Sequence, residues 1–388
     1  MAGIKLSLRT LLIWHFHVMR AIAMVPFSLS SGTPQQSQVY LGVSIALQIV
    51  LTIWKSIKAY PMLKISQWSV LAVAPNAQGL AFIVLITVIR LSLITSTRTM
   101  IKLLRYLTLK SVIDPRISRS TYAFLIVNMS TMMSNIYLDT KHSKERTDIV
   151  YFRVVMNLPY FITLRVVSLG INVALQYIAA DLKLQVRELI YLDEKNLAVT
   201  STSGVLPSNL QLNKSGFIRS KLHRIRNVRM ACQNIHSAFI LPVFLFLVYE
   251  PLELLILILF ALYAQNIQTV YGLLLFIIPG LVHLWLILDA PTDYERTCED
   301  GVHLIRKLIT EVGKEEQNRR KEVWQLRGIQ AELESMPRFT IFGLFELGRH
   351  CLLSMGSLVL IYVIIVVQFA GSGTPVTCLC SGTGNPPH

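Results

Sequence analysis

The apolar positions of the chain gather into long runs that are separated by polar, charged loops. Seven runs are mainly apolar and near twenty residues long, the length that a helix needs to cross a bilayer at ~1.5 Å per residue. The predicted spans are about 39–56, 77–95, 122–138, 150–178, 239–263, 270–288 and 351–370. The third run is the weakest of them, because it contains several Asn, Ser and Thr residues. The pattern predicts an all-α, polytopic membrane protein with seven transmembrane helices.

The composition agrees with this class of protein. The chain has 388 residues, of which 53% are hydrophobic and 15% charged, and its mean hydropathy is +0.52. A soluble domain would carry roughly a quarter charged residues. The formal net charge of +15 would favour nucleic acid as a partner of a soluble chain, but an excess of Lys and Arg on one membrane face explains it more simply. We therefore expect no nucleic-acid partner.

The positions of Lys and Arg predict the orientation. Basic residues crowd the segment before the first span and the second, fourth and sixth loops, whereas the fifth loop and the C-terminal tail have none. Because basic loops stay in the cytoplasm, the N-terminus should lie inside and the C-terminus outside. This is the reverse of a G-protein-coupled receptor. The glycosylation patterns at Asn128 and Asn213 would fall in a span and in the cytoplasm, so neither should be used.

The chain divides into five predicted regions. Residues 1–37 form a cytoplasmic N-terminus with an amphipathic helix against the membrane, and 38–290 hold spans one to six with the long cytoplasmic fourth loop, 179–237. Residues 291–350 form cytoplasmic anchor helices, 351–370 the seventh span and 371–388 a disordered extracellular tail. Within the fourth loop, 200–216 is rich in Ser, Gly, Asn and Pro and predicts a flexible loop.

The anchor region carries an apolar stripe at helical spacing. Its members are Val323, Leu326, Ile329, Gln330 and Leu333. Two interpretations stay open for this region: a solvated charged helix, or part of a hub that joins subunits.

Little in the sequence suggests catalysis. No nucleophile and base combine on one membrane face, so we expect no enzyme activity. The five cysteines are too scattered for a metal site, since Cys378 and Cys380 have no second pair of ligands nearby. No disulfide framework, metal or cofactor is implied.

Polar residues inside the spans are the candidate functional groups. Gln368 shares a helical stripe with Ile361 and Ile365, and it either bonds a neighbouring helix or faces a water-filled path. Glu250 and Glu253 lie three apart near mid-bilayer, so they need a wet cavity, a ligand or a partner such as Arg165 or Arg90.

Four short motifs give the chain a family resemblance. The last span contains Ile361-Tyr362, five apolar residues and Gln368-Phe369, which resembles the closing signature of the insect gustatory receptors, with Ile361 in place of a Thr. Gly343-Leu-Phe-Glu-Leu347 is similar to the lead-in to that helix, and Val25-Pro26-Phe27 to an N-terminal motif of the family. The segment that begins at Cys232 (Cys-Gln-Asn-Ile-His) is similar to the entry to the fifth helix.

This resemblance implies a ligand-gated, non-selective cation channel in the plasma membrane of sensory neurons. Four subunits would surround one pore, as a homotetramer or together with related receptors. The pore would be lined by the seventh helix, with the gate formed by Tyr362, Ile365, Gln368 and Phe369. The tastant pocket would lie among the outer halves of the second to sixth spans, where the candidates are Asn135, Tyr137, Asn157, Tyr160, Tyr249, Glu250, Glu253, Tyr263, Gln265 and Tyr271.

The expected partners are a small-molecule tastant, permeating cations and membrane lipid. The residue after the signature Tyr is Val363, where sugar-sensing members tend to have an acid, so we expect a bitter plant compound, with a fructose-type sugar as the alternative. From a different class, a secondary transporter would use the intramembrane carboxylates as coupling sites. Transporters usually show paired repeats, and we find none here.

Overall fold

The computed structural model describes residues 8–22, 24–28, 34–59, 70–109, 121–123, 125–127, 130, 147–203, 208–263, 267–315 and 320–372. The helices are α1 (Leu8–Ala21), α2 (Gln38–Ala59), α3 (Val70–Thr95), α4 (Thr97–Leu109), α6 (Thr147–Ser203), α7 (Ser208–Tyr263), α8 (Ile267–Glu315), α9 (Arg320–Glu334) and α10 (Arg349–Ser372). Two short hairpins pair β1 (Phe27–Ser28) with β2 (Gln35–Gln36) and β3 (Thr340–Ile341) with β4 (Phe345–Glu346). The predicted mostly helical fold is confirmed.

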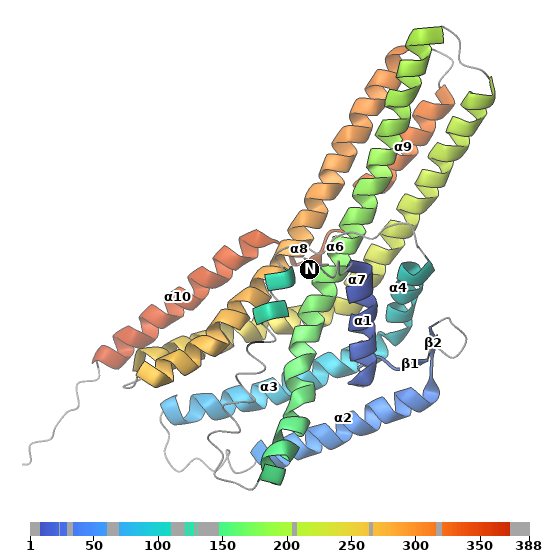
Figure 1. The fold of residues 1–388 in the computed structure, drawn as a ribbon. Coiled ribbons are helices and arrows are strands. Elements are labelled where there is room, and N and C mark those ends of the chain that lie inside the picture. The colour runs from blue at the N-terminus through green and yellow to red at the C-terminus, as the bar shows by residue number, and fades with distance from the viewer. Residues whose placement is uncertain are drawn as a thin grey trace, which may run out of the picture.

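Three long helices, α6, α7 and α8, run through the molecule (Figure 1). They have 57, 56 and 49 residues and are therefore about 75–85 Å long, more than twice the ~30 Å hydrocarbon core of a bilayer. Each helix must accordingly extend well beyond the membrane. The segment 179–237, which the sequence assigns to the cytoplasmic fourth loop, is largely helical in α6 and α7, and its side of the membrane stays a prediction.

At one end of the molecule the extensions of α6, α7 and α8 pack with α9 (Figure 1). We call this part the anchor bundle. Leu326, Ile329 and Leu333 of the α9 stripe are buried there, together with Ile225 of α7 and Ile305 of α8. The stripe thus closes a core within one subunit, because its aliphatic residues have neighbours on the long helices of the same chain.

One sequence prediction is wrong in this region. Residues 200–216 were expected to form a flexible loop, but α6 continues to Ser203 and α7 begins at Ser208. Turn-forming residues such as Ser and Asn disfavour helix only weakly, and here the helical context of two long elements overrides that preference. Only 204–207 could belong to a connection, and these residues lie outside the described part.

A buried lysine joins α7 to α6 in the anchor bundle. Lys221 is 3% exposed, donates a 2.9 Å hydrogen bond to Gln185 and forms an ion pair with Glu188. Asp181 is hydrogen-bonded in turn to Gln185 and, at 2.5 Å, to Tyr106 of α4. Because a charge far from water needs such partners, this network fixes which faces of α4, α6 and α7 meet.

The N-terminal helix predicted from the sequence is present as α1, and its apolar face lies on protein. Leu12, Phe16 and Met19 are buried, and α1 packs against α6. His15 lies so close to Gly170 that a Cβ added to this glycine would come within 2.3 Å of Nε2. A glycine at 170 is therefore what allows α1 and α6 to approach each other.

Not every predicted span can be recognised in the described residues. Within them, Ser215–Leu259 is long and apolar enough to cross a bilayer, and Leu80–Thr95 with Thr97–Tyr106 passes together as a pair bent by 62°. Gln38–Trp54 and Arg349–Ile365 are shorter apolar helices. The number of seven spans and the inside N-terminus stay predictions.

A tight hairpin precedes α10. Phe342 and Gly343 have φ angles of 50° and 74°, and the backbone N–H of Leu344 donates a 2.8 Å hydrogen bond to the carbonyl of Ile341. Two successive positive φ angles are typical of the turns that join antiparallel strands. This geometry gives a physical reason for the glycine in the Gly343-to-Leu347 motif. After the hairpin, α10 packs along α7 and α8 (Figure 1).

Candidate functional site

Buried polar residues of α6, α7 and α8 meet where the sequence predicts the membrane. We call Arg165, Tyr249, Glu250, Glu253 and His283 the Glu250 cluster. Glu250 is 4% exposed, and its Oε1 lies 3.8 Å from Nδ1 of His283. Tyr249 lies one helical turn before Glu253 on α7, and Arg165 lies within electrostatic range of both carboxylates. The predicted pairing of the acids with Arg165 is thus supported by their proximity.

Arg90, the other partner considered for these acids, bonds elsewhere. Its guanidinium is fully buried and donates to the hydroxyl of Thr163 at 3.3 Å and to the carbonyl of Ile22 at 2.6 Å. Arg90 therefore joins α3 to α6 and to the end of the N-terminal helix. Its role in the described contacts is to hold these elements together.

Aromatic rings and one glycine shape the surroundings of the Glu250 cluster. The rings of Phe82 and Tyr249 lie 5.6 Å apart, and those of Phe246 and His283 lie 6.0 Å apart. A Cβ added to Gly280 would come within 2.8 Å of Oε2 of Glu250. The missing side chain at position 280 is what lets the carboxylate of α7 approach α8.

Only part of the predicted tastant pocket can be placed. Tyr249, Glu250 and Glu253 are brought together, as described above. Other candidates lie on the long helices but their side chains are not described: Asn157, Tyr160, Tyr263 and Tyr271. Asn135, Tyr137 and Gln265 lie outside the described residues. The assignment of these residues to a ligand pocket stays a prediction.

The four predicted gate residues all lie on α10. Tyr362 and Ile365 are 49% and 39% exposed in the single subunit, and Gln368 is exposed as well. Phe369 follows on the same helix, but its side chain is not described. Among the described residues, therefore, nothing covers this side of α10, as is expected of a surface that faces a pore, a second subunit or lipid.

The start of α10 is tied to α8 by charge. Arg349 contacts Asp289 at 2.5 Å and Asp293 at 3.2 Å, and its backbone N–H bonds the hydroxyl of Thr292 at 3.0 Å. The hydrogen bond to Asp289 raises the pKa of Arg349 above its ordinary value. Asp289 is 6% exposed, so it depends on this partner. The same helix, α8, therefore contributes both to the Glu250 cluster and to the position of α10.

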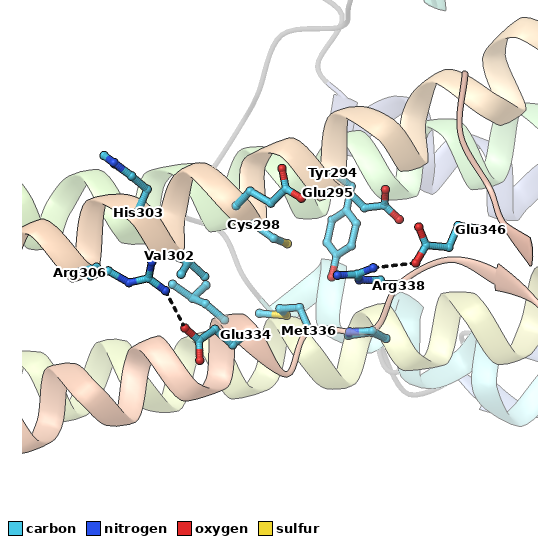
Figure 2. A pocket seen from close by; sticks show the side chains of 13 residues that line it. Tyr294, Glu295, Cys298, Val302, His303, Arg306, Glu334, Met336, Arg338 and Glu346 are labelled. Atoms are coloured by element: carbon cyan, nitrogen blue, oxygen red, sulfur yellow. Dashed lines mark hydrogen bonds and ion pairs between the residues drawn. The ribbon is translucent and has the colours of Figure 1, made fainter. Parts of the chain in front are cut away.

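A cavity of about 360 Å³ opens in the anchor bundle beside the β3–β4 hairpin (Figure 2). Two ion pairs border it, Arg306–Glu334 at 3.4 Å and Arg338–Glu346 at 2.7 Å. Burial and the nearby carboxylate of Glu346 raise the pKa of Glu295. The two ion pairs are matched within the chain, whereas the buried Oε1 of Glu295 has no hydrogen-bond partner among the described residues. The cavity by itself does not define a ligand.

The same cavity reaches the thiol of Cys298, whose pKa burial raises to about 12. The cysteines of the described part, Cys232, Cys298 and Cys351, are free and buried. Within that part, no group of three or more His, Cys, Asp and Glu side chains is arranged to hold a metal ion.

Sequence reasoning missed His283 and Gly280. A signal for His283 was present, since an ionisable residue inside a predicted span is a functional candidate by default. Gly280 had no comparable signal, because a glycine that permits one close contact looks like any other glycine in a helix. Its role depends on which residue of α7 lies opposite.

Helices longer than a bilayer is thick and a final apolar helix are typical of a helical membrane protein. The sequence model of the 7tm chemosensory receptor family matches residues 12–371, so the chain belongs to this family. The resemblance to insect chemoreceptors is thereby confirmed at the level of the family. Because this is a family of receptors, the expectation that the protein is not an enzyme is confirmed as well.

Solved structures show the same fold. The chain is similar to the insect olfactory receptor OR5 from Machilis hrabei in complex with eugenol, with a TM-score of 0.67 and 13% identity over 93% of this chain and 98% of that chain. A second structure of OR5 from Machilis hrabei gives a TM-score of 0.61 at the same identity and coverage. No curated protein sequence matches the chain at a significant level.

Proposed function

We propose that the protein is a gustatory receptor that acts as a ligand-gated, non-selective cation channel in the plasma membrane of sensory neurons. Four copies would assemble around one pore, and a bitter plant compound would open it. The observation that carries this proposal is the exposed, polar-tipped stripe of α10, Ile361, Ile365 and Gln368, on a helix whose opposite side contacts α7 and α8. Other side chains of α10, such as Leu353 and Leu358, are exposed as well.

The two sides of α10 support a pore position. At 100° per residue, Ile361, Ile365 and Gln368 fall within one sector, and Leu352, Val359 and Val363 fall on the opposite one. The second set lies toward α7 and α8, since these side chains line a cavity shared with both helices. The stripe that ends in Gln368 thus faces away from its own subunit, where a symmetry axis would lie.

The residue types of this stripe suit a gate. Four Phe369 rings around an axis could close a pore by dewetting, and four Gln368 amides would offer partners to a hydrated ion. The last span contains neither Asp nor Glu, so discrimination among cations should be loose.

The Glu250 cluster is the proposed centre for ligand recognition. Its two carboxylates could bind a basic alkaloid by charge or a polyol by hydrogen bonds. Val363 after the signature Tyr favours the bitter class, and a fructose-type sugar is the alternative. The buried carboxylate of Glu250 beside His283 would also suit ion coupling in a secondary transporter, the candidate from another class.

The gate is tested by recording from cells that express the full chain with Gln368→Ala or Phe369→Ala. Removal of either constriction group should raise the basal current several-fold or alter the relative permeability of Na⁺, K⁺ and Ca²⁺. Leu353→Ala, which changes an exposed residue near the start of α10, is the control and should leave both unchanged. Wild-type conduction in both gate variants would refute the gate, and flux without single-channel currents would favour the transporter.

The ligand assignment is tested by Glu250→Gln. Loss of a carboxylate from the Glu250 cluster should shift the midpoint of the ligand dose–response about tenfold, the effect of ~1.4 kcal/mol, while the conductance of the open channel stays constant. A panel of alkaloids and sugars supplies the ligand. Glu311→Gln, on the exposed surface of the anchor bundle, serves as the control. An unchanged midpoint would remove Glu250 from the pocket.

A further inference from the structure

A second cavity lies between α10 and the rest of its subunit, and Pro251 and Leu284, which line it, are chain neighbours of Glu250 and His283. It has a volume of about 460 Å³, is lined by α7, α8 and α10 and is open on one side. Pro251 and Ile258 line it from α7, Leu281 and Trp285 from α8, and Leu352 and Val363 from α10. Among the described residues that line it, the indole of Trp285 is the one charged or hydrogen-bonding side chain.

The chemistry of the wall restricts the occupant. Pockets for specific small molecules combine an apolar lining with a few placed polar groups that fix orientation. This cavity offers aliphatic side chains almost throughout, and an apolar cavity stays dry and accepts apolar molecules. A hydrocarbon chain meets these conditions, because it gains from leaving water and needs no hydrogen bond.

The length of the cavity matches one leaflet. Along α10 the lining extends from Leu352 to Val363, which is about 16 Å of helix. Half of the hydrocarbon core of a bilayer is ~15 Å. At the Leu352 end, the guanidinium of Arg349 lies 5.8 Å from the ring centroid of Trp285. A tryptophan with a neighbouring cation is typical of the membrane interface, where lipid headgroups lie.

We propose that this cavity binds an acyl chain of a phospholipid from the leaflet at the start of α10, the inner one in the predicted orientation. The chain would fill the space between α10 and its own subunit, on the side opposite Ile361, Ile365 and Gln368. Its presence would hold α10 at one distance from α7 and α8 and thereby bias the gate. The site itself rests only on the membrane position of α10, which the proposed function shares.

Gly356 provides a way to fill the cavity. It lines the wall from α10, and a Cβ added there meets no atom within 4 Å, so a larger side chain has room to enter. Gly42 of α2 is the matched control, because a Cβ added at this helical glycine likewise meets nothing within 4 Å. Val359→Phe narrows the same cavity by an independent route and guards against a folding defect specific to position 356.

The experiment uses the full chain, purified as its native assembly and placed in nanodiscs with phosphatidylcholine that carries a diazirine in its acyl chain. After illumination, mass spectrometry should find the lipid on peptides of α7, α8 and α10 that line the cavity. Gly356→Leu and Val359→Phe should each lower this labelling at least about fivefold, while Gly42→Leu leaves it unchanged. In recordings, the two filling variants should shift the ligand dose–response several-fold.

The outcomes separate the two proposals. Undiminished labelling in both filling variants would overturn the lipid site, and so would a peptide of a second copy of the chain cross-linked to the cavity in place of lipid. Lipid labelling without any ligand-evoked current would keep the site and contradict the channel function. Ligand-evoked current without lipid labelling would contradict the lipid site and keep the channel function.

Discussion

The two ends of α7 and α8 are built by opposite rules. In the anchor bundle, Ile225 and Ile305 are buried and Arg226 is exposed, where it pairs with Glu332. In the predicted membrane part, Glu250 and His283 are buried, whereas apolar side chains such as Val248, Leu252 and Ile278 are exposed. Along α7 and along α8, the pattern therefore changes from apolar residues inside and polar residues outside to polar residues inside and apolar residues outside.

This difference shows where each part of the molecule finds its stability. The anchor bundle completes an apolar core within one chain, because water drives its aliphatic residues together. In lipid that driving force is absent between helices, and the described contacts there depend on packing and on buried polar groups. Much of the surface of α10 is left exposed, so this helix depends on lipid or on other subunits for its cover.

The largest effect is expected when a buried side chain of the anchor bundle is shortened. Ile329 of α9 is fully buried, so Ile329→Ala should lower the free energy of unfolding of the subunit by about 2–5 kcal/mol. Ile361→Ala on the exposed stripe of α10 should change subunit unfolding little and weaken the proposed tetramer instead. Thermal unfolding and native mass spectrometry of the detergent-solubilised protein measure the two quantities. Equal loss of subunit stability in both variants would contradict the comparison.

A smaller effect is expected at the junction between the two parts. Arg349→Gln leaves the nearly buried Asp289 without its charged partner, which should cost about 1–3 kcal/mol once the partial exposure of Arg349 is allowed for. A double-mutant cycle with Asp289→Asn measures the coupling between the two residues. Arg306→Gln, in the exposed pair with Glu334, is the control and should have little effect. Additive effects in the cycle would mean that the Arg349–Asp289 contact does not hold α10.

The smallest effect concerns the pH dependence of stability at α1. Burial lowers the pKa of His15 to about 4, while the unfolded chain keeps the ordinary value near 6.5. The unfolded state therefore binds the proton first as pH falls, and stability is lost below pH 6.5. Between pH 7.5 and 5.5 the loss should be roughly 1 kcal/mol. Unfolding midpoints at the two pH values measure this loss. His15→Leu should remove the contribution of His15 to the pH dependence of stability, and an unaltered pH dependence would mean that another group causes it.

Much of the architecture was predictable because it follows from local patterns. Long apolar runs predicted the helices, and the stripe of Leu326, Ile329 and Leu333 predicted the face of α9 that packs. The signature from Tyr362 to Phe369 indicated the family. The 200–216 segment was predicted wrongly, since a composition typical of loops says little when two long helices extend into it.

The sequence by itself determined that the chain is helical, that it belongs in a membrane and that its final helix carries Gln368 on one stripe. Periodicity and hydropathy are properties of neighbouring residues, so they can be recognised along the chain. Only the tertiary structure decided that Glu250 lies beside His283, where Gly280 leaves room for its carboxylate. The same holds for the contact of Arg349 with Asp289 and for the apolar cavity between α10 and the helices α7 and α8. These contacts join residues far apart in sequence, and helix packing alone sets their register.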